Sequence, residues 1–252
     1  DLCIFLNGLP IITMELKNQF TLQNTADAVK QYKTDRDPAE KLFSFKRCIV
    51  HFAVDDNEIM MCTELKKDDS YFMPFNKGFE DGAGNPPNSS GIRTDYLWKD
   101  ILTKNEFSKI LENYVQIVAD KDEDTGKTTY KQIFPRYHQL KAVTMLLDRA
   151  KKEGAGQRYL IQHSAGSGKS NSIAWLAHQL VTLQNDGKNI FDTVIVVTDR
   201  INLDKQIKNT IKQFTQVSST VGWAKSASDL HTLLDEGKKI IITIVHKFQF
   251  IL

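Results

Sequence analysis

The stretch His163-Ser-Ala-Gly-Ser-Gly-Lys-Ser170 constrains the fold of this 252-residue chain more than any other part of it. An apolar run, 159–161, comes before it, and apolar residues recur at helical spacing after it, from 173 to 180. A strand, a glycine-rich loop and a helix in this order form a phosphate-binding loop (P-loop). We therefore predict a strand at 159–161, a P-loop at 163–170 and a helix that begins near Lys169.

The residue types of the predicted P-loop explain how it would hold a triphosphate. Glycines let the backbone curl around a phosphate with N–H groups pointing inward, and the helix N-terminus adds the positive end of its dipole. Lys169 would reach the β- and γ-phosphates, and the Ser170 hydroxyl would hold Mg²⁺. The predicted nucleotide-binding residues here are Ser164, Ala165, Gly166, Ser167, Gly168, Lys169 and Ser170. The alternative is an ordinary glycine–serine turn before a helix.

The composition is that of a soluble globular protein with one large domain or two modest ones, since 41% of residues are hydrophobic and 25% are charged. The net charge of +2 predicts no general attraction to nucleic acid, so a nucleic-acid site would need local patches. No apolar run approaches the roughly 20 residues of a membrane span. The chain opens without Met, inside an apolar run, and we expect it to be a piece of a longer protein.

The three cysteines, Cys3, Cys48 and Cys62, show neither C-x-x-C spacing nor histidine partners at zinc-finger intervals. Free thiols in a reducing compartment fit this pattern better than disulfides or a structural metal do. We therefore expect a cytoplasmic protein.

Residues 1–17 predict two strands around an Asn7-Gly8 turn. Side chains alternate along a strand, so Glu15 and Lys17 would share a face, and a hairpin in register would bring Asp1 alongside them. Two carboxylates and a lysine at a strand end can hold Mg²⁺, polarise a phosphodiester and lower the pKa of a bound water. The alternative is a solvated strand edge with alternating charges.

The remainder of the N-terminal half alternates strands, helices and one long loop. A second Glu-x-Lys triplet, at 64–66, follows a hairpin of 48–54 and 59–63, and its upstream acidic residues suit a turn. The pattern predicts helices at 24–33 and 39–47, helical periodicity over 96–119 and a loop at 76–95. Around the charged turn at 120–127 the pattern becomes strand-like, at 115–118 and 128–130.

The C-terminal half predicts a doubly wound, parallel sheet. The run 194–197 predicts a strand buried on both faces, followed by a helix at 201–211 and a further strand at 239–245. Gln139 stands at the start of an amphipathic helix, 140–150, and its amide could pair with N6 and N7 of adenine. The alternative for Gln139 is a surface glutamine near a helix start.

These motifs together resemble a known family. Asp1, Glu15 and Lys17 resemble the PD-(D/E)xK nuclease superfamily, and 134–139, 163–170 and 197–200 resemble superfamily 2 helicases and translocases, which often lack the first P-loop glycine. In this order, across essentially the whole chain, they resemble the R (restriction, HsdR) subunit of type I restriction-modification enzymes.

The resemblance implies a PD-(D/E)xK nuclease-like mixed sheet at 1–103 and a RecA-like parallel-sheet helicase lobe at 104–252, both incomplete. It also implies ATP-dependent translocation of double-stranded DNA coupled to Mg²⁺-dependent cleavage of unmodified DNA, in a complex with methyltransferase and specificity subunits. The cofactors would be ATP and Mg²⁺.

The resemblance adds further site residues. Gln31, on the helix after the Glu-x-Lys triplet, becomes a candidate near the metal, and Gln139 the adenine contact. Thr198, Arg200 and Lys247 would contact the DNA backbone, although Arg200 could instead cap a carboxylate pair and Lys247 could be a solvated loop lysine.

Two competing interpretations differ in whether the chain is a nuclease or an enzyme at all. The first is a superfamily 2 helicase of repair or of another restriction class, with a structural N-terminal domain. The second is a non-enzymatic nucleotide-binding regulatory domain. No Asp-Glu pair follows the last strand, so we expect the chain by itself to lack appreciable ATPase activity.

Overall fold

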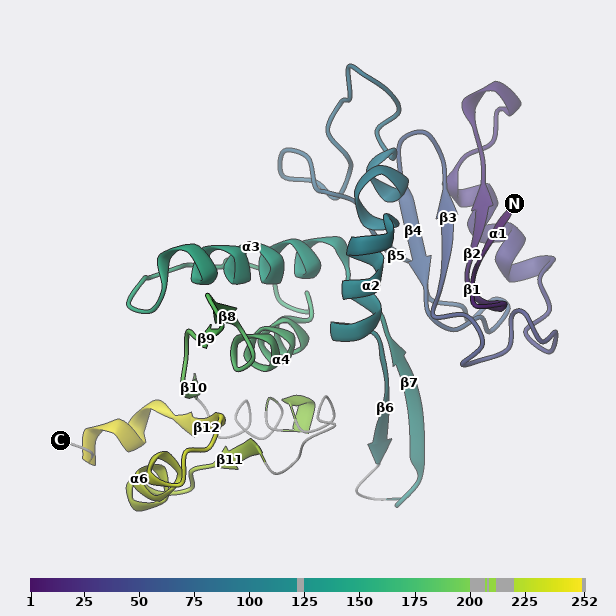
Figure 1. Cartoon of the computed structure of the whole chain (residues 1–252). Helices are drawn as coiled ribbons and strands as arrows, with labels where there is room; N and C mark the ends of the chain where they lie inside the picture. Colours follow the sequence, from purple (N-terminus) through teal and green to yellow (C-terminus); the bar gives the residue numbers. More distant parts are fainter. Residues whose placement is uncertain (122–124, 200–206, 208, 212–219, 251–252) are drawn as a thin grey trace. The chain divides into compact units, whose positions relative to one another are not determined.

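The computed structural model describes residues 1–121, 125–199, 207, 209–211 and 220–250, and Figure 1 shows the chain. It forms two compact units, 1–138 and 139–252, and each is described by itself below. Element labels follow Figure 1, with its gaps in numbering. The predicted domain boundary at 103/104 differs from this division into compact units, and it stays a prediction.

The first unit is built on a five-stranded mixed sheet with the order β1-β2-β3-β4-β5. Its strands are β1 (Leu2–Leu6), β2 (Leu9–Leu16), β3 (Val50–Val54), β4 (Ile59–Cys62) and β5 (Met73–Pro74). Only β2 and β3 pair in parallel, and the chain between them contains helix α1 (Thr25–Thr34). This crossover is what a parallel pair requires.

The predicted N-terminal hairpin is confirmed. Asn7 and Gly8 have φ of 49° and 80°, the left-handed values that a two-residue hairpin turn needs. Leu2 pairs with Met14, so the next position outward places Asp1 opposite Glu15.

The second predicted hairpin, β3 to β4, is also confirmed. Asp55 accepts hydrogen bonds from the backbone N–H groups of Asn57 and Glu58, both at 2.7 Å, and from Thr25 at 2.8 Å. These bonds hold the turn and the start of α1, which is the structural role the sequence predicted for this acidic residue.

Helix α1 is fixed at its start by a capping box and along its length by burial. The Asn24 side chain accepts from the backbone N–H of the first turn, and Asp27 accepts from the Asn24 N–H at 2.8 Å. Ala28 and Tyr32 are fully buried and pack with Ala53 and other residues of the sheet. The helix therefore packs against β2, which carries Glu15 and ends just before Lys17.

The remainder of the first unit follows the predicted order, with one exception. It contains η2 (Leu97–Ile101), α2 (Lys104–Asn113), and the antiparallel ribbon of β6 (Gln116–Lys121) and β7 (Thr128–Ile133), which Figure 1 shows extending beyond α2. The helix predicted at 39–47 is wrong: the segment forms successive turns, and Lys46 adopts a φ of 71° that ends any helical run. The loop at 76–95 is confirmed and is anchored by Asn85, which is 1% exposed.

The second unit combines helices with a parallel three-stranded sheet of order β10-β12-β11. Its elements are α3 (Tyr137–Glu153), which begins at the end of the first unit, α4 (Lys169–Leu180), β8 (Gln184–Asn185), β9 (Lys188–Asn189), β10 (Val194–Thr198), β11 (Val221–Trp223), α6 (Ala227–Asp235), β12 (Ile240–Ile244) and η4 (Val245–Phe250). Every helix within the described residues is too short or too polar to cross a membrane.

Two strand predictions in this unit need correction. Residues 159–161 form no strand, and Leu160 is 89% exposed. The strand at 194–198 exists, but Ile195 and Val197 are 39% and 48% exposed, because the described part of the unit packs α4 against only the Val196 side of β10. The predicted helix at 201–211 lies largely outside the described residues, and α6 and β11 were not predicted.

Candidate functional site

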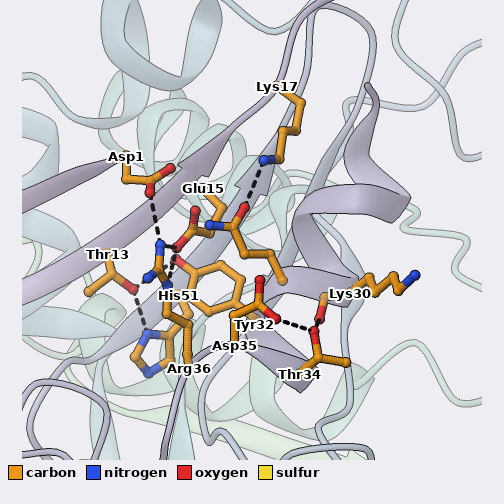
Figure 2. Close-up of polar contacts among 11 residues, drawn as sticks. Asp1, Thr13, Glu15, Lys17, Lys30, Tyr32, Thr34, Asp35, Arg36 and His51 are labelled. Carbon is orange, nitrogen blue, oxygen red and sulfur yellow. Dashed lines mark hydrogen bonds and ion pairs between the residues drawn. The ribbon is translucent and has the colours of Figure 1, made fainter. Parts of the chain in front are cut away.

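The predicted carboxylate pair of the N-terminal hairpin is bridged by an arginine (Figure 2). The Arg36 guanidinium lies 2.8 Å from Asp1 Oδ2 and 2.6 Å from Glu15 Oε1. The Glu15 side chain is 4% exposed, whereas the Asp1 side chain is 50% exposed. The hairpin register thus places one carboxylate in the protein interior and the other at the surface, both within reach of one cation.

The second oxygen of Glu15 takes no part in the bridge to Arg36. Glu15 Oε2 is buried and has no hydrogen-bond partner, and a buried carboxylate oxygen in that state is costly unless something binds it. The described residues contain no group of three or more His, Cys, Asp and Glu that could hold a metal ion. Mg²⁺ is typically bound through only one or two carboxylates, with water and substrate phosphates completing its shell. Asp1 and Glu15 therefore fit this ion.

Lys17 is held beside the pair by a neutral group. Its Nζ donates to Gln31 Oε1 at 2.7 Å, and its backbone N–H donates to Val54 O at 2.8 Å. The structure thus brings the predicted Lys17 and Gln31 together, from strand end and helix α1 respectively. Among the described residues Lys17 forms no ion pair with a carboxylate, so its charge remains able to meet an anionic substrate.

A buried polar network behind Glu15 was not predicted. Thr13 Oγ1 lies 2.8 Å from the Tyr32 hydroxyl and 2.6 Å from His51 Nδ1. Burial lowers the pKa of His51 to about 4 and raises the pKa of Tyr32 above its ordinary value. A neutral His51 imidazole therefore contacts Thr13 of β2, the strand that also carries Glu15.

Arg36 was also missed by the sequence analysis. It follows the end of α1, where a cation complements the helix dipole. No local pattern marked it, because Arg36 lies beyond the end of α1 and meets the two carboxylates only through the fold.

The predicted P-loop starts helix α4 as expected. Gly168 is the N-cap with φ of 81°, and Gly166 has φ of 71°, so both positions use backbone conformations that favour glycine. Lys169 Nζ donates to the carbonyl oxygens of Ser164 at 2.8 Å and His163 at 3.1 Å. The loop therefore curls around its own lysine, as a phosphate-binding loop would.

Gln139 contacts the loop directly. Its Nε2 donates to Gly168 O at 2.8 Å, and the residue is 3% exposed. The adenine contact predicted for Gln139 stays a prediction, and the structure adds a bond that fixes the loop from the first turn of α3. Ser167 is buried and Ser170 is half-buried within the same loop.

The predicted DNA contacts are only partly described. Thr198 is 5% exposed at the end of β10, and Lys247 Nζ donates to the Ala224 carbonyl. Arg200 lies outside the described residues. All three DNA contacts stay predictions.

Comparison with known proteins finds two family models that match different parts of the chain. Residues 1–70 match the family model described as type I restriction enzyme R protein N terminus. Curated relatives match along nearly all of the chain. One is the type I restriction enzyme HindI endonuclease subunit of Haemophilus influenzae, 28% identical over 98% of this chain and 23% of its own length. The chain is thus similar to type I restriction enzyme endonuclease subunits along nearly its whole length.

A second curated relative matches over the same span. It is the putative type I restriction enzyme MjaVIIIP endonuclease subunit of Methanocaldococcus jannaschii, 26% identical over 99% of this chain and 24% of that subunit. The chain thus spans about a quarter of the length of the curated relatives it matches. Residues 138–251 match the family model described as SWI2/SNF2 ATPase, and this match covers the P-loop.

Proposed function

We propose that this chain contributes the nuclease and the first motor lobe of a type I restriction enzyme R subunit. The whole subunit would couple ATP-dependent translocation of double-stranded DNA to Mg²⁺-dependent endonucleolytic cleavage of unmodified DNA. The observation that carries the proposal is the buried, unpartnered Oε2 of Glu15, beside Asp1 and Lys17, in the same chain as a P-loop. The fold of the first unit is accordingly proposed to be that of the PD-(D/E)xK nucleases.

In the proposed nuclease site, Asp1 and Glu15 would hold Mg²⁺. The bound ion would polarise the phosphodiester and lower the pKa of a water. Lys17 orients that water and stabilises negative charge as it develops on the phosphorus oxygens. Gln31 acts as a positioning residue, because its 2.7 Å bond to Lys17 Nζ fixes where that charge lies.

In the proposed nucleotide site, the P-loop N–H groups and Lys169 bind the phosphates of ATP. Ser170 would hold the accompanying Mg²⁺ and Gln139 the adenine. Binding of the phosphates replaces the bonds that Lys169 makes to Ser164 and His163. The loop is therefore already folded before nucleotide binds, and Lys169 exchanges its carbonyl partners for phosphate oxygens.

The proposal extends to partners and location. Methyltransferase and specificity subunits would select the DNA sequence, and Thr198, Arg200 and Lys247 would contact the DNA backbone. The complex would act on DNA in the cytoplasm of a bacterial or archaeal cell.

The proposed nuclease site is tested by Glu15→Gln in the full-length subunit, assembled with its partner subunits and supplied with ATP, Mg²⁺ and unmodified DNA. We expect cleavage to fall about 100-fold or more, with ATP hydrolysis retained. Glu64→Gln is the matched control, because Glu64 belongs to the second Glu-x-Lys triplet and pairs with Lys66 at 2.8 Å. Undiminished cleavage by Glu15→Gln would contradict the proposal and would favour a superfamily 2 motor with a structural N-terminal sheet.

A further inference from the structure

We infer that Arg36 is an internal cation that competes with the metal ion for Asp1 and Glu15, and so sets the metal affinity of the site. The inference rests on the proposed function of these two carboxylates. It makes Arg36 a positioning residue for the reaction, acting through the metal ligands rather than on the substrate.

The contacts show that Arg36 uses the oxygens an ion would need. The guanidinium bonds one oxygen of each carboxylate, Asp1 Oδ2 at 2.8 Å and Glu15 Oε1 at 2.6 Å. The remaining oxygen of Glu15 is the buried one that has no partner. A divalent ion bound between the two carboxylates would meet the guanidinium on both of its ligands.

Charge explains why one cation would replace the other. Glu15 is almost fully buried, and a buried carboxylate without a partner is strongly disfavoured, so a cation in the site stabilises the fold. A divalent ion satisfies the same two negative charges and repels a guanidinium at contact distance. The two cations therefore exclude each other, and the site exchanges one for the other.

The surroundings of Arg36 give it a place to remain after the exchange. Its Cζ lies 5.8 Å from the ring centroid of Phe43, which is 8% exposed and packed in the core of the first unit. An arginine over an aromatic face retains favourable contact without a carboxylate. The Arg36 side chain is 26% exposed, so it has room to turn toward solvent.

Lys17 does not take the same part. Both carboxylates pair with Arg36, whereas Lys17 Nζ donates to the neutral Gln31 amide. Arg36 and Lys17 thus have different roles. Arg36 neutralises the metal ligands, and Lys17 stays available to the substrate.

The experiment titrates Mn²⁺ into the full 252-residue chain without nucleotide, and follows free Mn²⁺ by electron paramagnetic resonance. Arg36→Gln removes the charge at similar length, and we expect it to tighten Mn²⁺ binding about tenfold, since charge-assisted hydrogen bonds no longer compete. Arg36→Lys keeps the charge but loses the two-armed geometry, so its binding should tighten less. Arg149→Gln, in the exposed pair with Glu153 at 3.8 Å, should leave Mn²⁺ affinity unchanged.

Glu15→Gln separates this inference from the proposed function. If the unsubstituted chain binds Mn²⁺ in a manner that Glu15→Gln abolishes, but Arg36→Gln binds equally or more weakly, the competition is overturned and the nuclease site stands. If no Mn²⁺ binding depends on Glu15 in any variant, the metal site itself is contradicted. Circular dichroism checks folding. If Arg36→Gln does not fold, Arg36→Lys decides the matter: tightened Mn²⁺ binding supports the competition, and unchanged binding overturns it.

Discussion

The two candidate sites are assembled from different materials. The N-terminal site consists of side chains drawn from the start of the chain, from β2 and from the residues after α1, and each charge in it is met by another side chain. The P-loop consists mainly of backbone within eight consecutive residues, and its lysine is met by carbonyl oxygens of the same loop.

This difference predicts what each site tolerates. A site made of paired side chains depends on each partner and on the elements that position them. A site made of backbone depends on glycine conformations and on one reaching lysine, and it is less sensitive to its neighbours' side chains. The following four predictions test this contrast.

The largest effect is expected at Lys169, the one side-chain charge in the loop. In the full-length subunit, Lys169→Ala should reduce ATP hydrolysis by at least about 100-fold, because the phosphates lose their cationic contact, and DNA cleavage should fall with it. A colorimetric phosphate assay measures the loss. Lys151→Ala, an exposed lysine of α3, should behave like the unsubstituted protein; vigorous hydrolysis by Lys169→Ala would refute the nucleotide site.

The buried network behind Glu15 should make the first unit sensitive to acid. Burial lowers the pKa of His51 from 6.5 to about 4. Between these values the unfolded chain binds a proton that the folded chain does not, so stability is present above pH 6.5 and is lost as pH falls toward 4. This loss should reach about 3 kcal/mol.

Urea denaturation at several pH values measures it, with His51→Gln expected to flatten the curve in this window. The same substitution at exposed His231 of α6 controls for loss of a surface imidazole. Identical pH curves for His51→Gln and the unsubstituted chain would show that the network carries no such proton linkage.

Backbone dependence of the P-loop can be tested with a matched pair of glycines. Both Gly166 and Gly168 have positive φ, so alanine at either should cost about 1–2 kcal/mol. A Cβ at Gly168 would also meet Gln139 Nε2 at 2.4 Å, whereas at Gly166 nothing lies within 4 Å. Gly168→Ala should therefore weaken nucleotide binding more than Gly166→Ala, as measured by fluorescent ATP analogues. Equal losses would mean that the contact with Gln139 is not important.

The smallest effect on stability is expected at the two capping boxes, which have the same design. Asn24 caps α1, which carries Gln31, and Ser226 caps α6, which bears no predicted P-loop residue. Alanine at either should cost about 1 kcal/mol of unfolding free energy. Only Asn24→Ala should also reduce metal-dependent cleavage, because it loosens the helix that holds Lys17. Reduced nucleotide binding by Ser226→Ala would erase the contrast between the two sites.

The same contrast explains what could be predicted from sequence. The Asn7-Gly8 hairpin, α1 and the start of α4 are set by local patterns, and all three were predicted correctly. Arg36, Thr13 and His51 come together only through the pairing of β2 with β3 and the packing of α1, and no local pattern announces them. The strand predicted at 159–161 failed for a similar reason, since an apolar run forms a strand only where a partner strand pairs with it.

The most direct test of the account replaces Lys17 with alanine in the full-length subunit, with DNA cleavage and DNA translocation measured on the same preparation. We expect cleavage to be lost while translocation and ATP hydrolysis continue, because Lys17 belongs to the side-chain site and not to the P-loop. Cleavage at the unsubstituted rate would contradict the central claim that the N-terminal hairpin is the nuclease.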